Sequence, residues 1–123
     1  MNNYLNERQY HVIVAGRNYG NLLAMARALG KVGYQAILLR IYDKKPNNLN
    51  PMNWIRIEKE SKYTCAYKTI ISQNKGMNVV DELIKINSSK RKMCLFPVDD
   101  YTANLIDANY DVLKDYYHLL HHL

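Results

Sequence analysis

Two short apolar runs separated by a helical pattern dominate the first third of the chain. Residues 10–15 are mostly aliphatic and lead into Gly16, and residues 35–41 form a second run of the same kind. Each run is too short for a capped helix and predicts a buried strand. Between them, residues 21–32 repeat leucine and alanine at helical spacing and end at Gly33. A strand, a helix and a strand in so short a stretch predict a right-handed crossover between parallel strands.

The remainder of the chain continues the alternation of strands and helices. The elements that its patterns indicate are an edge strand at 54–57, a helical turn at 61–63, a third strand at 68–71, a helix at 78–87, a fourth strand at 93–96, a helix that opens at Asp99 and Asp100 and runs to Ala108, and a helix at 110–120. Residues 43–53 hold two of the 3 prolines and are expected to form a surface loop. Asn109 is expected to close the preceding helix in a left-handed conformation.

This order of elements predicts an α/β fold. We expect a Rossmann-like open parallel sheet of about four strands, in the order 3-2-1-4, with helices on both faces. A length of 123 residues, 48% of them hydrophobic, suits one domain over residues 1–123. No apolar run approaches the roughly 20 residues that span a bilayer, and residues 1–8 are polar rather than signal-like. A cytoplasmic protein without a membrane partner is expected.

The basic balance of the chain has a simple explanation. A formal net charge of +6 could indicate a nucleic-acid-binding surface. However, lysine, asparagine and tyrosine are abundant together, and AT-rich codons supply these same residues. The 11 tyrosines also lack a clear stacking period. We therefore expect no nucleic-acid partner.

The cysteines and histidines do not form a convincing metal site. Cys65 and Cys94 lack a Cys-x-x-Cys spacing and are expected to be reduced thiols. His118, His121 and His122 would share one face of a helix, but no nearby cysteine or acid completes a ligand set. We expect neither a metal ion nor a catalytic residue in this segment.

One pair of loops is a candidate binding site. In open parallel sheets, ligands bind beyond the carboxyl ends of two neighbouring strands that the chain leaves in opposite directions. Arg17 and Asn18 follow the first strand, and Asp99 and Asp100 follow the fourth. We expect Asp99 or Asp100 to bind an amino group, and Arg17 a carboxylate, of a small substrate.

Helix capping is the alternative role for these residues. Asn18 or Asn21 can cap the first helix, and Asp99 or Asp100 can cap the helix after the fourth strand. The two roles are compatible, because a capping carboxylate is expected to leave its second oxygen exposed.

The turn after the first strand also supports a different function. Residues 16–21 partly resemble the dinucleotide fingerprint Gly-x-Gly-x-x-Gly, with Asn18 in place of the second glycine. Asp43 follows the second strand, where an acid can hold an adenosine ribose. A stand-alone NAD-binding regulatory module is therefore the alternative function, and a protein-interaction module stays open.

The order of the segments resembles a known family. It is similar to the N-terminal, or pre-ATP-grasp, domain of ATP-grasp carboxylate–amine ligases, which include carbamoyl-phosphate-synthase-like proteins and D-aspartate-ligase-like enzymes. The matching segments extend over nearly the whole chain and are 12–16, 21–30, 61–63, 95–100 and 109–113. The polar stretch 44–53 departs from the family pattern, as does the end of the chain at Leu123, where the ATP-grasp fold would follow.

The resemblance implies a function for a longer parent protein. Such an enzyme activates a carboxylate with ATP and Mg²⁺ and lets an amine attack the acyl phosphate. This segment would form one wall of the substrate cleft and would be inactive alone. Its implied partners are a downstream ATP-grasp domain, which binds ATP and Mg²⁺, and a small carboxylate or amine substrate; a homodimer is also compatible with the pattern.

Overall fold

The computed structural model describes residues 10–43, 64–87 and 92–119. The elements in chain order are β1 (Tyr10–Gly16), α1 (Tyr19–Lys31), β2 (Gln35–Tyr42), β3 (Thr64–Ile71), the 3₁₀ turn η2 (Asn74–Gly76), α3 (Met77–Ile86), β4 (Met93–Pro97), α4 (Asp100–Ala108), α5 (Tyr110–Leu113) and β5 (Tyr117–Leu119). The elements expected at 54–57 and 61–63, and the loop 44–53, lie outside the described residues.

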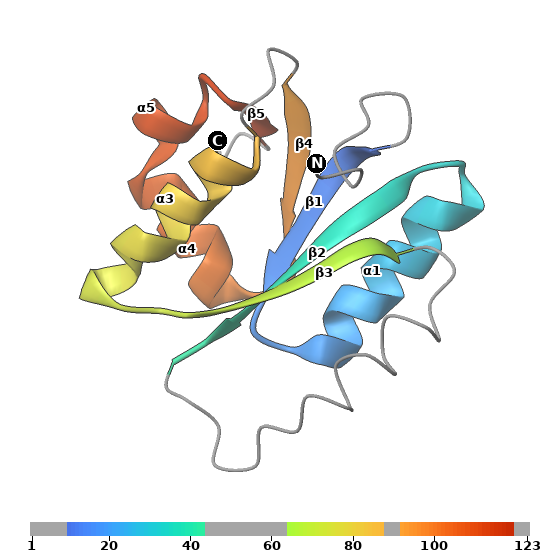
Figure 1. Ribbon diagram of the computed structural model, residues 1–123, viewed down its shortest axis with the longest axis horizontal. Helices are drawn as coiled ribbons and strands as arrows, with labels where there is room; N and C mark the ends of the chain where they lie inside the picture. Colours follow the sequence, from blue (N-terminus) through green and yellow to red (C-terminus); the bar gives the residue numbers. More distant parts are fainter. Residues whose placement is uncertain (1–9, 44–63, 88–91, 120–123) are drawn as a thin grey trace.

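The strands form one parallel sheet in the order β3-β2-β1-β4-β5 (Figure 1). The predicted α/β class and the predicted order of the first four strands are therefore confirmed. The strand β5 was not predicted and extends the sheet beyond β4. This arrangement makes β1 the central strand, with β2 on one side and β4 on the other.

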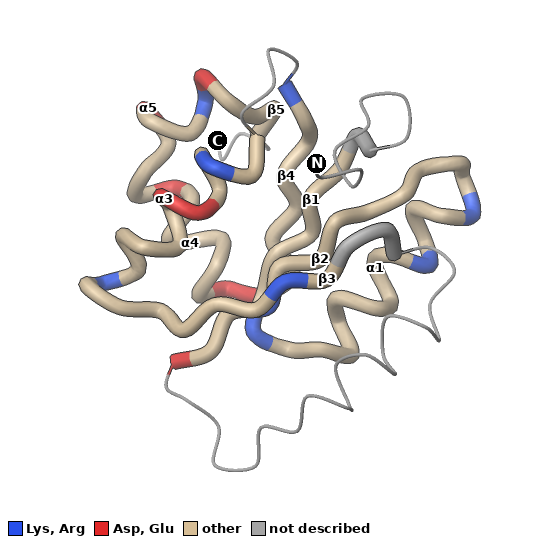
Figure 2. The backbone as a smooth tube through the Cα atoms, viewed as in Figure 1, with Lys and Arg blue, Asp and Glu red and all other residues tan. Residues whose placement is uncertain are grey.

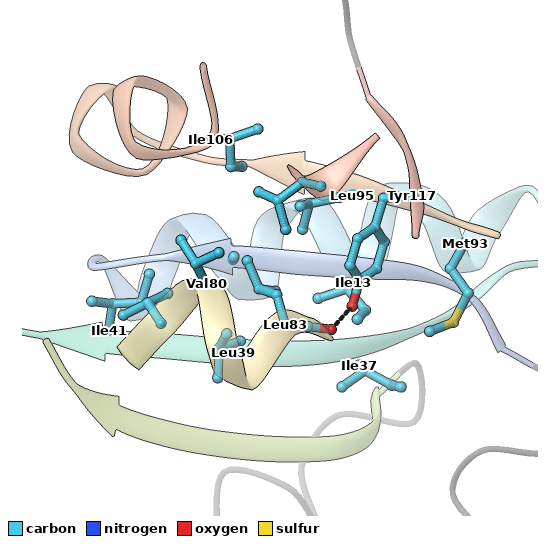
Figure 3. Packing of buried hydrophobic residues seen from close by; sticks show 13 residues of the cluster. Ile13, Ile37, Leu39, Ile41, Val80, Leu83, Met93, Leu95, Ile106 and Tyr117 are labelled. Carbon is cyan, nitrogen blue, oxygen red and sulfur yellow. Dashed lines mark hydrogen bonds between the residues drawn. The ribbon is translucent and has the colours of Figure 1, made fainter. Parts of the chain in front are cut away.

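Helices pack on both faces of the sheet, as the sequence predicts. Along β1, Val12 and Val14 face α1, where Leu22 and Ala26 are buried with them. Ile13 lies on the opposite face, where the buried side chains come from α3, α4, α5 and β5 (Figure 3). The alternation of side chains along a strand divides the core into two layers. Apolar runs such as 12–15 in β1 and 36–39 in β2 are the consequence.

The helix predicted at 110–120 is wrong over its second half. Helix α5 ends at Leu113, and Tyr117–Leu119 pairs with β4 as a parallel strand. Tyr117 is 1% exposed, and its hydroxyl donates a hydrogen bond to the carbonyl of Leu83 in α3 (Figure 3). Tertiary interactions override the local helix propensity here. The backbone of 117–119 pairs with the edge of β4, and the Tyr117 ring packs in the core. His118 is consequently exposed on a strand, and the predicted His121 and His122 lie outside the described residues.

The left-handed closure predicted at Asn109 is also wrong. Asn109 has φ −118°, its N–H donates to the carbonyl of Ile106 over 3.1 Å, and α5 begins at the next residue. Among the described residues, left-handed backbone occurs instead at Gly33, after α1, and at Asn74, Lys75 and Gly76, before α3. A Cβ on Gly76 would lie 2.7 Å from Leu105 Cδ1, so glycine allows the start of α3 to approach α4 closely.

Candidate functional site at the carboxyl edge of the sheet

The predicted crevice coincides with the point where the chain leaves two neighbouring strands in opposite directions. Strands β1 and β4 are adjacent and parallel, with Ala15 opposite Pro97. The chain passes from β1 to α1 on one face of the sheet and from β4 to α4 on the other. Figure 2 shows acidic and basic segments gathered where these strands end. Ligands bind at this position in open α/β sheets.

Close backbone packing joins the two strand ends. The N–H of Val98 donates to the carbonyl of Ala15 over 3.0 Å. A Cβ on Gly16 would lie 2.2 Å from Val98 Cγ2 and 2.8 Å from Asp99 Oδ2. No real Cβ is found so close to another heavy atom, so this turn requires glycine because of space and not because of its backbone angles.

Asp99 uses both carboxylate oxygens in structural hydrogen bonds. Oδ1 accepts from the backbone N–H of Thr102 over 2.8 Å, which makes Asp99 the N-cap of α4. Oδ2 accepts from the backbone N–H of Arg17 over 2.6 Å. The expectation that a capping carboxylate leaves its second oxygen exposed is therefore wrong for Asp99. Asp100, in the first turn of α4, is exposed and is the better placed acid for a ligand.

Asn18 is confirmed as the N-cap of α1. Its Oδ1 accepts from the backbone N–H of Asn21 over 2.9 Å, and its carbonyl accepts from the N–H of Leu22 over 3.1 Å. The same asparagine that interrupts the dinucleotide fingerprint therefore begins the helix. Helix α1 starts at Tyr19, earlier than the sequence predicts.

Arg17 reaches away from the turn toward β2 and α4. Its guanidinium forms an ion pair with Asp43, and the two side chains are 43% and 53% exposed. The guanidinium carbon also lies 4.9 Å from the centre of the Tyr101 ring, within cation–π range. The hydroxyl of Tyr101 is hydrogen-bonded to Ser72 Oγ over 2.7 Å. Tyr101 was not predicted; its position next to the Asp99 and Asp100 pair, in the first turn of the helix, was the available signal.

A groove of about 590 Å³ opens beside this corner, between α1 and the start of α4. Its lining residues are Asn21, Ala24, Met25, Ala28, Pro97, Val98, Asp99, Asp100 and Ala103. The predicted Asp99 and Asp100 line the groove, whereas Arg17 and Asn18 do not. Small apolar walls with a carboxylate at one end suit a ligand that joins a cationic amine to a short apolar group.

A second group of side chains at this edge combines arginine with tyrosines. The guanidinium carbon of Arg40 lies 4.7 Å from the ring centre of Tyr42 and 5.6 Å from that of Tyr19. The ring of Tyr67 makes an edge-on contact with Tyr19 at 6.1 Å. Burial raises the pKa of Tyr42 and raises that of Tyr67 strongly, so both hydroxyls stay protonated to a higher pH than an exposed tyrosine does. No sequence pattern indicated this cluster, since its members come from three elements.

The described segments contain neither a cluster of metal ligands nor a membrane-spanning helix. Within residues 10–43, 64–87 and 92–119, no three histidine, cysteine or acidic side chains come together to hold a metal ion. Cys94 is a free thiol, as predicted. Cys65 belongs to β3, but its side chain is not among those that the structure describes. No helix in these same ranges has the length and apolar character required to cross a bilayer.

Comparison with known proteins adds no family assignment. No family model, curated protein or solved structure matches this chain significantly. The edge where β1, β2 and β4 end is therefore the feature from which a function can be inferred.

The turn after β1 is a poor site for a pyrophosphate. In dinucleotide-binding turns, free backbone N–H groups at the start of the helix donate hydrogen bonds to the phosphate oxygens. Here the N–H of Arg17 already donates to Asp99, and the Asp99 carboxylate would repel a phosphate at the same position. The geometry therefore disfavours the binding of NAD, and equally of a nucleoside triphosphate, at this turn.

Proposed function

We propose that this chain is the substrate-side N-terminal domain of an ATP-dependent carboxylate–amine ligase of the ATP-grasp type. The observation that carries the proposal is the corner at Asp99, where a carboxylate fixes the end of β1 to the start of α4 and Asp100 lines an open groove beside it. The strand order and the position of the corner also agree with the resemblance noted in the sequence.

The residues of this edge have the chemistry to bind and orient a substrate. The Asp100 carboxylate accepts hydrogen bonds from an ammonium group, while Ala24, Met25 and Ala28 contact an apolar substituent. Arg17, on the other side of the corner, pairs with a carboxylate. These side chains hold the reacting groups, and no proton transfer or covalent step is assigned to them.

The chemical step belongs to the downstream domain. ATP and Mg²⁺ held there would supply the phosphoryl group that activates a carboxylate. The turn after β1 does not fit a phosphate, for the reason given above, so this chain contributes the wall of the cleft and not the nucleotide site. The cytoplasm, where ATP is available, is the compartment that accords with this role.

A calorimetric and NMR titration of the purified chain tests the proposal. We expect weak, millimolar binding of amino acids from a panel that varies side-chain size, and about five-fold weaker binding after Asp100→Asn, since one charge-assisted contact at an exposed site is lost. Asp115→Asn is the matched control, because it removes the same charge from the exposed turn before β5, away from the groove.

Titration with NADH distinguishes the alternative function. Micromolar binding of NADH that disappears in Asp43→Ala would replace the ligase proposal with a dinucleotide-binding module. An amino-acid affinity that is equal in the parent chain and in Asp100→Asn would remove the groove from the proposal.

A further inference from the structure

The guanidinium of Arg17 contacts two side chains, and a ligand could replace one of them more easily than the other. One is the carboxylate of Asp43, at the end of β2, and the other is the ring of Tyr101, in α4. The ion pair is solvent-exposed on both sides, at 43% and 53%. Pairs of this kind contribute little to stability, because water and salt compete for each charge. A second carboxylate could therefore replace Asp43 at small cost.

The Tyr101 ring keeps the guanidinium in place when the anion changes. Tyr101 is half-buried, its position on α4 follows the capped start of the helix, and its hydroxyl is hydrogen-bonded to Ser72. The ring face contacts the guanidinium through its π-electrons and does not use the N–H groups that bind carboxylates. The donors of Arg17 are thus oriented before a ligand arrives, which lowers the entropy cost of binding.

Asp43 occupies this position as a built-in carboxylate. Its backbone follows β2 directly, and the neighbouring Tyr42 is fixed in the sheet, with its carbonyl accepting from the N–H of Ser72 over 2.6 Å. The acid is therefore presented to Arg17 at a high local concentration. A free carboxylate must compete with it.

We propose that Arg17 and Tyr101 form a carboxylate subsite that Asp43 occupies in the ligand-free chain, so that a substrate carboxylate binds by displacing Asp43. This inference rests on the proposed function, because it specifies how the carboxylate of that same substrate is recognised. Asp43 raises the concentration of ligand needed for binding and excludes anions that cannot replace a carboxylate.

Succinate is a suitable probe, because it carries carboxylates without an amine. The isotopically labelled chain is titrated with succinate by NMR, with chloride adjusted to keep the ionic strength constant. We expect Asp43→Asn to bind succinate about three-fold more tightly than the parent chain, the change that an exposed ion pair of ordinary strength allows. Arg17→Gln is expected to abolish the binding, and Tyr101→Leu to weaken it.

Asp115→Asn again serves as the control for charge. It removes one negative charge from an exposed turn that precedes β5, whereas Asp43 follows the end of β2, so the two lie toward opposite edges of the parallel sheet. Its succinate affinity should equal that of the parent chain. An increase in Asp115→Asn as large as in Asp43→Asn would mean that net charge, and not displacement, controls binding, and would overturn the inference.

The outcomes separate the inference from the proposed function. Equal succinate affinity in the parent chain and in Asp43→Asn, with both dependent on Arg17, overturns displacement and leaves the ligase proposal standing. Absence of Arg17-dependent binding in every variant overturns both the subsite and the carboxylate recognition. Tighter succinate binding in Asp43→Asn without any binding of amino acids supports the subsite and contradicts the ligase proposal. Circular dichroism of each variant establishes that it is folded.

Discussion

The backbone N–H of Arg17 donates a hydrogen bond of 2.6 Å to Asp99 Oδ2, across 82 positions of sequence. This bond connects the turn before α1 to the N-cap of α4, and these two helices pack on opposite faces of the sheet. The other oxygen of Asp99 caps α4 over 2.8 Å. One carboxylate thus fixes the two helix starts that border the candidate site, and its charge is compensated by two backbone donors.

Substitutions at Asp99 should separate these two bonds. Asp99→Asn can retain the cap through its amide oxygen but cannot accept the Arg17 N–H with its amide nitrogen, and we expect a loss of about 1 kcal/mol in the free energy of unfolding. Asp99→Ala loses both bonds, and we expect about 2–3 kcal/mol. Urea unfolding measures both values. Asp100→Asn, with an expected change below about 0.5 kcal/mol, is the control; equal losses for Asn and Ala at position 99 would contradict the separate role of the Arg17 contact.

Gly16→Ala should destabilise the chain through a clash and not through backbone strain. The added methyl group would lie 2.2 Å from Val98 Cγ2, so β1 and the β4–α4 corner must move apart. We expect a loss of about 1–3 kcal/mol. Gly16→Ala combined with Val98→Ala should recover part of this loss relative to the sum of the two single changes, as a double-mutant cycle of unfolding measures. Strict additivity would show that the two sites do not interact.

Alkaline stability should depend on Tyr117. Burial, with a smaller contribution from the Glu82 charge, raises the pKa of Tyr117 above its ordinary value of about 10. The folded chain therefore keeps the Tyr117 proton at a pH where the unfolded chain has lost it. The resulting stabilisation is fully present below about pH 10 and decreases as the pH rises toward the folded-state value, by about 1.4 kcal/mol per pH unit.

Tyr117→Phe tests this dependence. The variant loses the hydrogen bond to Leu83, so we expect it to be about 1 kcal/mol less stable than the parent chain at neutral pH. The difference should shrink above about pH 10, since phenylalanine does not titrate. Tyr116→Phe removes the same atom from the neighbouring, half-buried residue and is the control. A difference between parent and Tyr117→Phe that stays constant from neutral to alkaline pH would contradict the role of burial.

Kinetics in a ligase that contains this chain and a downstream ATP-grasp domain would test the binding role of Asp100. We expect Asp100→Asn to raise the KM for the amine substrate about five-fold and to leave kcat nearly unchanged, because the lost contact is the same in the ground state and in the transition state. The purified 123-residue chain should not hydrolyse ATP. ATP turnover by this chain alone, or a fall in kcat without a change in KM, would assign a catalytic role that the proposal does not include.

The elements that sequence analysis located well are those whose signals are local. Apolar runs at β1, β2 and β4 indicate buried strands, because every position of a central strand faces a layer of core. The capping role was predicted for Asn18 or Asn21 and for Asp99 or Asp100, because a short polar side chain bonds a backbone N–H only three positions away; the structure assigns the two caps to Asn18 and Asp99. The handedness of the crossovers then restricts the order of these strands to very few arrangements.

The sequence alone thus determined the α/β class, the order of the first four strands and the edge of the sheet at which Arg17 and Asp99 meet. Only the tertiary structure decided that Tyr117 enters a strand, that Asp43 and Tyr101 share the guanidinium of Arg17, and that Gly16 is required by Val98. The physical reason is the separation along the sequence of the residues that interact. Propensity and capping act over one turn of chain, whereas these contacts join residues that are distant in sequence, and their geometry exists only once the layers have packed together.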